Sequence, residues 1–316
     1  MKKLLLLLLV VTSLFAQKMQ KPDYIFKTAD LVTDVITSNM LLYAANDAGS
    51  VDVFDIKSKK RLKHIELSKI KDFMGDEIDS KIFSIDILDN ELLILSQDSG
   101  GYSRVEIYRD EKLESVISKD ERLNIIKAKY IDSETILLAL ISNDIISYNI
   151  KSKKMNWSIQ ASMSKFSNFA LNHNKSRVAI ADESGDVHII STKDGKIVDT
   201  LKGENVDNIF AVDFSHNVVI TGGQDRRVGV YHIGSSNAYH KTSNFFVYGV
   251  GLSPSGKIAA YSCDMDNNIE LFNSDNGESI GKFSGNKKVV NSIYFLDEKS
   301  FFVNSADKEV RFFKLK

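Results

Sequence analysis

A short pattern of alternating apolar residues recurs seven times along the chain, and it constrains the fold more than any other feature. The copies are Val51-Asp52-Val53-Phe54, Val105-Glu106-Ile107-Tyr108, Ile145-Ile146-Ser147-Tyr148, Val187-His188-Ile189-Ile190, Val228-Gly229-Val230-Tyr231, Ile269-Glu270-Leu271-Phe272 and Val310-Arg311-Phe312-Phe313. Successive copies begin 54, 40, 42, 41, 41 and 41 residues apart. A period of about 40 to 45 residues with several short strands per repeat is typical of a β-propeller. We therefore predict an all-β, seven-bladed propeller over residues 17–316.

The fourth repeat shows how one blade divides into four strands. Its apolar stretches cover residues 166–171, 177–181, 187–191 and 197–201, which we call strands a, b, c and d in order from the axis outward. Polar turns separate the stretches, and Asp194-Gly195 between c and d supplies the positive φ that a tight hairpin needs. The last repeat stops after strand c, so we expect the extended segment Tyr24-Ile25-Phe26-Lys27 to supply its missing outer strand and to close the ring.

The N-terminus has the features of an export signal. Lys2 and Lys3 precede the apolar run from Leu4 to Val11, and the small residue Ala16 follows. The run is short for a membrane-spanning helix, so we predict a signal peptide over residues 1–16, cleaved after Ala16. No cysteine follows the run, which excludes lipid attachment there. These features predict a periplasmic protein with no stable membrane insertion after cleavage; an uncleaved anchor is the alternative.

The charge balance argues against a nucleic-acid partner. The chain of 316 residues has 41 Lys and Arg against 42 Asp and Glu, for a net charge of −1. A nucleic-acid-binding protein normally carries a basic patch that neutralises phosphates. We therefore expect a protein partner and no nucleic acid.

Two segments resemble repeats of the WD40 family, namely residues 219–231 and 302–313. Both place an aspartate, Asp225 or Asp307, three residues before strand c, and Asp47 and Asp266 look equivalent. In that family this aspartate hydrogen-bonds within its own blade, so the resemblance implies a structural role for all four. The resemblance is degenerate, because aromatic or aliphatic residues replace the family's Trp and its Gly-His pair is absent. The family's Asp-His-Ser/Thr-Trp network therefore cannot be assumed here.

A signal peptide on a single divergent WD40-like propeller is a narrower resemblance. The chain is similar in this respect to the exported WD40-type accessory proteins of periplasmic nitrate reductase, the NapL type. This resemblance rests on overall appearance and export, without a diagnostic motif. It implies a soluble periplasmic helper of a molybdenum-containing nitrate reductase that assists maturation or electron supply.

The sequence contains no recognisable catalytic or metal-binding motif. The six histidines show no ligand spacing with cysteine or carboxylate, and neither a Cys-x-x-Cys-His motif nor a phosphate-binding glycine loop occurs. The one cysteine, Cys263, follows a strand-b segment and is expected to be a small core residue. The one tryptophan, Trp157, falls in the outer strand of the third repeat, away from the axis. We therefore expect no catalytic residue, no metal and no cofactor.

The irregular first spacing of 54 residues points to a candidate binding site. The excess lies mostly in residues 68–81, between the first and second repeats, and partly in the b–c turn at 97–104. Both connections emerge at the same end of the ring, because antiparallel strands alternate in direction. Insertions clustered on one face of a repeat protein often mark its binding face. The candidate partner-binding residues are Phe73, Met74, Asp76, Glu77, Tyr102 and Arg104; a tolerated surface loop is the alternative.

The sequence thus favours an exported, non-catalytic protein-interaction scaffold. Two other functions remain open. A propeller enzyme would need metal-binding or cofactor-stacking residues that converge on the axis, and an outer-membrane assembly factor would capture proteins of the β-barrel assembly machinery.

Overall fold

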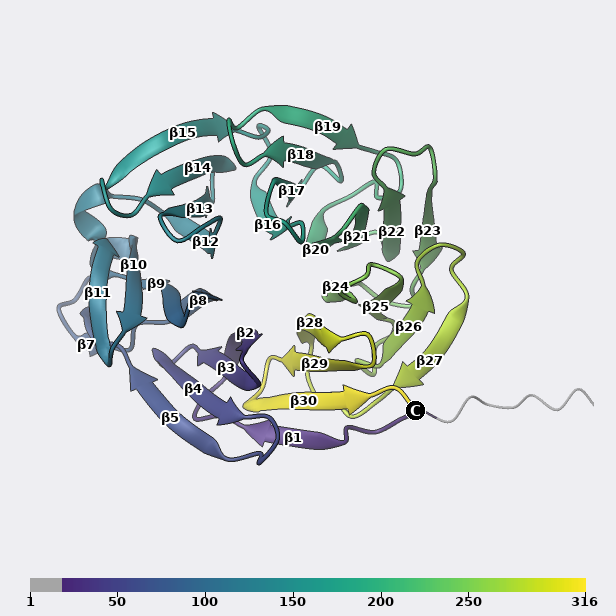
Figure 1. Cartoon of the computed structure of the whole chain (residues 1–316), viewed down its shortest axis with the longest axis horizontal. Coiled ribbons are helices and arrows are strands. Elements are labelled where there is room, and N and C mark those ends of the chain that lie inside the picture. Colours follow the sequence, from purple (N-terminus) through teal and green to yellow (C-terminus); the bar gives the residue numbers. More distant parts are fainter. Residues whose placement is uncertain (1–18) are drawn as a thin grey trace, which may run out of the picture.

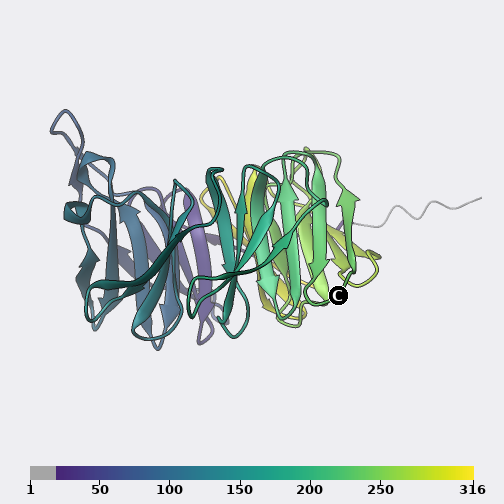
Figure 2. The same cartoon turned by 90° about the horizontal axis from the view of Figure 1, so that it is seen from above.

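The computed structural model describes residues 19–316 and shows seven four-stranded antiparallel sheets arranged as blades around a central axis (Figure 1). The predicted seven-bladed propeller is therefore confirmed. Viewed edge-on, the ring is a thick disc with connections on two opposite faces (Figure 2). The predicted signal peptide, residues 1–16, lies outside the described residues.

The inner to outer strands of each blade follow the chain in six of the seven sheets. The first blade is β2 (Val32–Ser38), β3 (Leu41–Asn46), β4 (Ser50–Asp55) and β5 (Arg61–Glu66). The second is β8 (Ile82–Leu88), β9 (Glu91–Gln97), β10 (Ser103–Arg109) and β11 (Lys112–Ile117), and the third is β12 (Ile125–Tyr130), β13 (Thr135–Leu140), β14 (Asp144–Asn149) and β15 (Lys154–Gln160). The fourth is β16 (Phe166–Leu171), β17 (Arg177–Asp182), β18 (Val187–Ser191) and β19 (Ile197–Leu201).

The remaining blades complete the ring. The fifth is β20 (Ile209–Ser215), β21 (Val218–Gly223), β22 (Arg227–His232) and β23 (Ala238–Thr242), and the sixth is β24 (Val250–Leu252), β25 (Ile258–Ser262), β26 (Ile269–Asn273) and β27 (Ser279–Phe283). The seventh joins β28 (Val290–Asp297), β29 (Ser300–Ser305) and β30 (Glu309–Lys314) to β1 (Tyr24–Lys27). Two short 3₁₀ turns, η1 (Ser99–Gly101) and η2 (Lys119–Glu121), lie in connections, and a two-stranded hairpin pairs β6 (Ile70–Lys71) with β7 (Glu77–Ile78).

The ring closes through β1, as the sequence predicts. Strand β1 pairs antiparallel with β30, with Tyr24 opposite Phe312 and Phe26 opposite Val310. Phe26 is 2% exposed and packs edge-on against Phe54 of the first blade, with 5.3 Å between the ring centroids. The N-terminal strand therefore joins the seventh blade by its backbone and reaches the first blade through a side chain.

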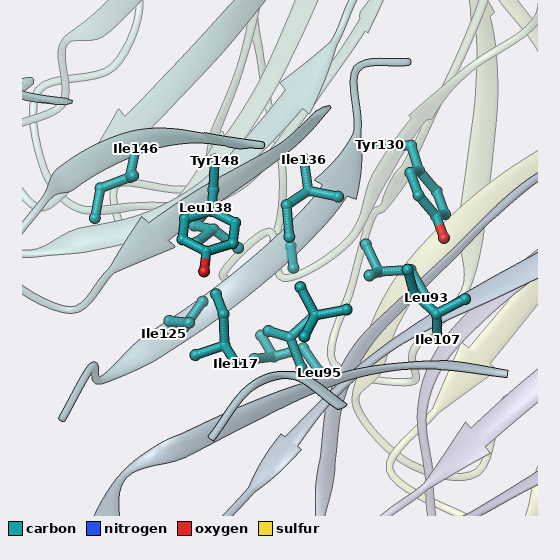
Figure 3. Close-up of a cluster of buried hydrophobic side chains, with 13 residues drawn as sticks. Leu93, Leu95, Ile107, Ile117, Ile125, Tyr130, Ile136, Leu138, Ile146 and Tyr148 are labelled. Atoms are coloured by element: carbon teal, nitrogen blue, oxygen red, sulfur yellow. The ribbon is translucent and has the colours of Figure 1, made fainter. Parts of the chain in front are cut away.

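The hydrophobic core is divided into seven clusters, each between two neighbouring blades. Figure 3 shows the cluster between the second and third blades, where Leu93 and Leu95 of β9 face Ile136 and Leu138 of β13. Alternate residues of each strand point to opposite faces of its sheet, so every middle strand contributes to two clusters. Each blade is consequently buried on both faces, which explains why the repeated segments are apolar at most positions.

Candidate binding face and central channel

The two faces of the disc differ in how many large apolar side chains their connections expose. We call the face that carries the d–a connections and the b–c turns the d–a face, and the opposite one the a–b face. The exposed large apolar residues on the d–a face are Leu31, Phe73, Met74, Ile141, Met163, Val206, Phe246, Met265 and Val289. Among the described residues the connections of the a–b face expose one, Met40. Six of the seven d–a connections carry at least one of these residues, so exposed apolar side chains are distributed around most of the d–a face.

The β6–β7 hairpin is the largest projection on the d–a face, and it rises clear of the disc (Figure 2). Its tip is an ordered turn, because Asp72 Oδ1 accepts hydrogen bonds from the backbone N–H groups of Met74 (2.8 Å) and Asp76 (3.0 Å). Gly75 at φ 89° completes the turn. Phe73 and Met74 are left 89% and 86% exposed, so two large apolar side chains are held in solvent by a fixed backbone.

The second insertion supports the base of this hairpin. The backbone N–H of Lys71 donates to Ser99 Oγ at 3.1 Å, which joins the hairpin directly to η1. The Arg104 guanidinium donates to the Ser68 carbonyl at 2.8 Å and forms an ion pair with Glu106 at 3.2 Å. The structure thus brings both insertions together on one face, as the sequence predicts.

The six candidate partner-binding residues take different roles in this arrangement. Phe73, Met74, Asp76 and Glu77 belong to the hairpin, and all four are exposed. Tyr102 is half-buried beside Gly100, at the end of η1. The Arg104 side chain is 11% exposed and engaged by its neighbours, so it positions the hairpin and offers little surface to a partner.

The aspartates predicted to stabilise the b–c turns divide into two groups. Asp225 accepts from the Asn205 side chain (3.1 Å) and from the Val206 N–H (2.8 Å), and Thr221 Oγ1 donates to Asn205 Oδ1. This is a hydrogen-bond chain within one blade. Asp307 accepts two bonds from the buried guanidinium of Arg311, at 3.2 and 2.7 Å.

The other two turns use a neighbouring residue in that structural role. In the first blade Asn46, rather than Asp47, accepts from the N–H groups of Ala48 and Ser50. In the sixth blade Asp264, rather than Asp266, accepts from the backbone and the side-chain amide of Asn268. The acceptors in these two turns are therefore Asn46 and Asp264, one or two residues before the predicted Asp47 and Asp266.

The central channel forms a cavity of about 520 Å³ that is lined by the inner strands. Its carboxylates join neighbouring blades: Asp34 accepts from the Ile85 N–H (2.9 Å), and Asp86 accepts from the Tyr130 N–H (2.7 Å). Asp213 does the same with the Leu252 N–H at 2.8 Å, and burial raises its pKa. These groups satisfy backbone donors at blade junctions, where an unpaired N–H would be costly.

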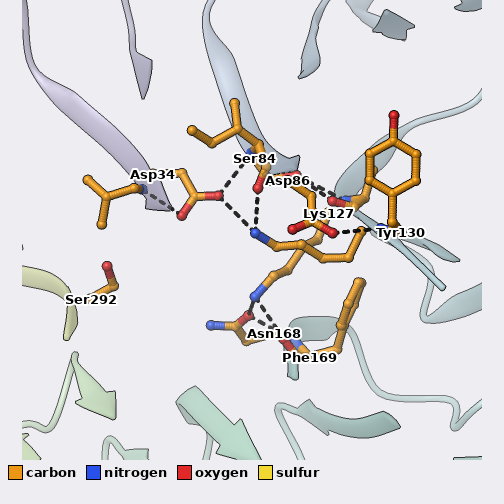
Figure 4. A network of polar contacts seen from close by, with 12 residues as sticks. Asp34, Ser84, Asp86, Lys127, Tyr130, Asn168, Phe169 and Ser292 are labelled. Carbon is orange, nitrogen blue, oxygen red and sulfur yellow. Dashed lines mark hydrogen bonds and ion pairs between the residues drawn. The ribbon is translucent and has the colours of Figure 1, made fainter. Parts of the chain in front are cut away.

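Two lysines of β12 face the same channel (Figure 4). Lys129 Nζ contacts Asp34 at 3.4 Å and the Ile85 carbonyl, whereas Lys127 Nζ donates to Asn168 Oδ1 and to the Phe169 carbonyl, both at 2.7 Å. Burial, together with the charge of Lys129, lowers the pKa of Lys127 to about 8. Sequence reasoning assigned no role to these residues.

The cysteine, the tryptophan and two of the histidines make contacts within or between blades. Cys263 is buried between the fifth and sixth blades, and burial raises the pKa of its thiol to about 12. Trp157 lies in the outer strand β15 and donates from Nε1 to the Thr192 carbonyl. His188 and His232 approach Asp182 at 3.9 Å and Asp275 at 3.3 Å. Over residues 19–316, no group of three or more potential metal ligands gathers at one point.

The fold is the basis on which this protein can be classified. The class that the structure defines is a seven-bladed β-propeller. No model of a protein family matches the chain, and no curated protein matches it. Within residues 19–316, no helix has the length and apolar character needed to cross a membrane.

Proposed function

We propose that this propeller is an exported, non-catalytic scaffold that binds a protein partner through its d–a face, with the β6–β7 hairpin as the principal contact. The observation that carries the proposal is the pair Phe73 and Met74, which are 89% and 86% exposed on a turn that is hydrogen-bonded into shape. Exposure of large apolar side chains to water is unfavourable, so covering them with a partner gains free energy. Aromatic residues and Met are enriched in protein interfaces.

The rigidity of the hairpin supports a binding role over a tolerated insertion. A preformed contact loses less conformational entropy on association than a mobile loop does. The tip is fixed by Asp72, and the base is fixed by Arg104 and Ser99. A neutral surface insertion would need none of these bonds.

The surroundings of the hairpin favour a partner with both apolar and basic residues. Asp72, Asp76, Glu77 and Asp79 lie within the insertion, against Lys69, Lys71 and Lys81. The Asp79 carboxylate is already near Lys69 at 3.6 Å, and Asp76 and Glu77 are exposed beside the tip. Opposite charges on a partner would steer its approach, while the apolar tip would supply most of the affinity.

The narrower proposal is that the partner belongs to periplasmic nitrate reductase, which the protein would assist in maturation or electron supply. Its support is the resemblance of an exported, divergent WD40-like propeller to accessory proteins of that system. Periplasmic location in turn rests on the export signal in residues 1–16. A role in outer-membrane protein assembly and an enzymatic role remain the alternatives.

The test is affinity capture of the tagged mature chain from periplasmic extract of cells grown with and without nitrate. Recovery of nitrate reductase subunits, lost in the double variant F73S/M74S, supports both the partner and the site. The matched control is L62S/M155S, which removes two apolar residues that are 58% and 54% exposed on outer strands away from the d–a face. Capture that survives F73S/M74S rejects the hairpin as the site. Capture of barrel-assembly proteins in place of the reductase rejects the nitrate link.

A further inference from the structure

The methionines of this protein lie on its surface. Methionine is usually a core residue, because its flexible apolar side chain fills gaps between buried groups. In residues 19–316, by contrast, every methionine is at least 42% exposed, and the seven clusters of buried side chains contain none. The described part of the ring is therefore packed without methionine, and a change to these side chains leaves its core untouched.

The three most exposed methionines share one face of the disc. Met163, Met74 and Met265 are 90%, 86% and 73% exposed, and all three lie in connections of the d–a face. The other three are 42% to 54% exposed and lie elsewhere, namely Met19 before β1, Met40 in an a–b turn and Met155 in β15. The thioethers that a solute reaches most easily are thus on the face that we assign to partner binding.

The one thiol of the chain does not compete with these thioethers for an oxidant. Cys263 is 5% exposed, and burial keeps its thiol protonated at neutral pH, whereas the thiolate is the form that reacts. A thioether has no proton to lose, so its oxidation in a folded protein depends mainly on access by the oxidant. Exposed methionines are therefore the sulfur atoms that a peroxide reaches first.

We propose that Met74 is a reversible oxidation site, at which a peroxide converts the thioether to a sulfoxide and so weakens the partner contact of the β6–β7 hairpin. This inference rests on the function proposed above. The sulfur lone pair attacks one peroxide oxygen, so that an S–O bond forms, the O–O bond breaks and the other oxygen leaves as water. The sulfur loses two electrons and the peroxide gains them. In the reverse reaction two thiols become a disulfide, and the sulfoxide oxygen leaves as water.

The position of Met74 lets one added oxygen atom change the contact without disturbing the ring. Its backbone N–H is held by Asp72 Oδ1 at 2.8 Å, while its side chain is exposed on a hairpin that rises clear of the disc (Figure 2). A sulfoxide is polar, and burying it in an apolar contact is unfavourable unless the partner offers a hydrogen-bond donor. Oxidation should therefore act on binding and leave folding unchanged.

The modification is tested first on the tagged mature protein alone. The protein is treated with hydrogen peroxide, and the oxidised fraction of each methionine is followed by mass spectrometry. We expect Met74 to be oxidised faster than Met155, because its side chain is more exposed, and we expect this difference to disappear in denatured protein. Denaturant unfolding of the oxidised protein should match that of the untreated protein. Slower oxidation of Met74 than of Met155 in the folded protein overturns the proposal, and so does unfolding of the ring on oxidation.

The effect on binding is then measured by affinity capture from periplasmic extract, after the peroxide has been removed so that the partner is not oxidised. The oxidised wild type should recover about tenfold less of the partner than the untreated protein does. Treatment with a methionine sulfoxide reductase and a thiol should restore capture. The variant M74L keeps an apolar side chain of similar volume that peroxide does not oxidise, so it should keep most of its capture after treatment. The matched control M155L should lose capture as the wild type does.

The outcomes distinguish this inference from the scaffold proposal. Equal capture by oxidised and untreated wild type overturns the oxidation site as a regulator and leaves the scaffold proposal standing. Equal loss of capture in oxidised wild type and oxidised M74L overturns the assignment to Met74. Failure of the untreated protein to capture any partner overturns both the scaffold proposal and its regulation.

Discussion

Phe26 in the ring closure and Phe73 at the hairpin tip show the two ways in which this chain uses aromatic residues. Phe26 of β1 is 2% exposed and lies between the seventh and first blades, whereas Phe73 at the hairpin tip is 89% exposed. Phe26 belongs to one of the clusters of buried apolar side chains that fill the blade junctions. Met163 in another d–a connection is as exposed, at 90%, but among residues 19–316 only Phe73 and Met74 lie on a two-stranded hairpin within such a connection. The regular part of the molecule therefore accounts for stability, and the irregular part is where a specific contact can be made without cost to the ring.

The largest effect is expected at the ring closure. The substitution F26A removes a ring that packs on Phe54 and Phe302, so it should lower the free energy of unfolding by about 3 to 5 kcal/mol. The matched substitution F73A should change it by less than about 0.5 kcal/mol, because no packing is lost. Denaturant unfolding of both variants measures the difference. Equal losses would show that the hairpin packs on the ring in solution.

A smaller effect is expected within the fifth blade. The substitution D225A leaves the side-chain amide of Asn205 and the N–H of Val206 without their acceptor, and a buried donor left unpaired costs about 1 to 3 kcal/mol. The control D266A changes the exposed aspartate of the sixth-blade turn, where Asp264 accepts the hydrogen bonds, and should be nearly neutral. Similar losses in the two variants would mean that the two turns do not differ as described.

The b–c turn of the sixth blade repeats the same contrast over three residues, since Cys263 is buried and Met265 is 73% exposed. The folded protein keeps the thiol proton to about pH 12, because burial raises its pKa, while an unfolded cysteine loses it near pH 8.5. The unfolded state thus binds fewer protons between these pH values, and stability falls as pH rises through that window. By pH 9.5 this contribution should reach about 1 kcal/mol.

The check is to compare the wild type with C263A by denaturant unfolding at pH 8 and pH 9.5. The wild type should lose about 1 kcal/mol more than the variant over this interval, and its native thiol should react slowly with a thiol reagent at pH 8. Parallel pH dependences in the two proteins would show that the thiol does not ionise differently on folding.

Periodicity carries most of the information about the fold, and it does so for physical reasons. Buried strands must be apolar, and turns must contain residues suited to them, so both recur at each blade; the predicted strands of the fourth repeat match β16 to β19 to within one residue. The closure by β1 was predictable because residues 24–27 form an apolar segment without a blade of its own, and the last repeat lacks its outer strand. The structural roles of Asn46 and Asp264 were not, because the side chain that accepts the hydrogen bonds of a turn depends on the local backbone geometry, which the repeat spacing does not reveal.

The candidate sites were predictable to different degrees. The hairpin follows from the irregular spacing, but the structural role of Arg104 depends on a contact with Ser68, which is distant in the sequence. The two lysines of the channel were missed, although one signal was present. Lys127 and Lys129 alternate along an inner strand, where most positions of the other blades are apolar or small. Period-two charges on the innermost strand of a propeller must face its axis.

The smallest expected effect concerns the order of the hairpin tip itself. The substitution D72A removes the acceptor for the backbone N–H groups of Met74 and Asp76, each bond contributing about 1 kcal/mol. Because the tip opens locally without unfolding the ring, the hydrogen exchange of these two amides should accelerate by roughly fivefold or more, while denaturant stability stays within about 0.5 kcal/mol. The substitution D79A, at the base of the same hairpin, serves as the control and should leave both amides unchanged. Unaltered exchange in D72A would mean that the tip is not held by Asp72, and the preformed contact on which the scaffold proposal depends would lose its support.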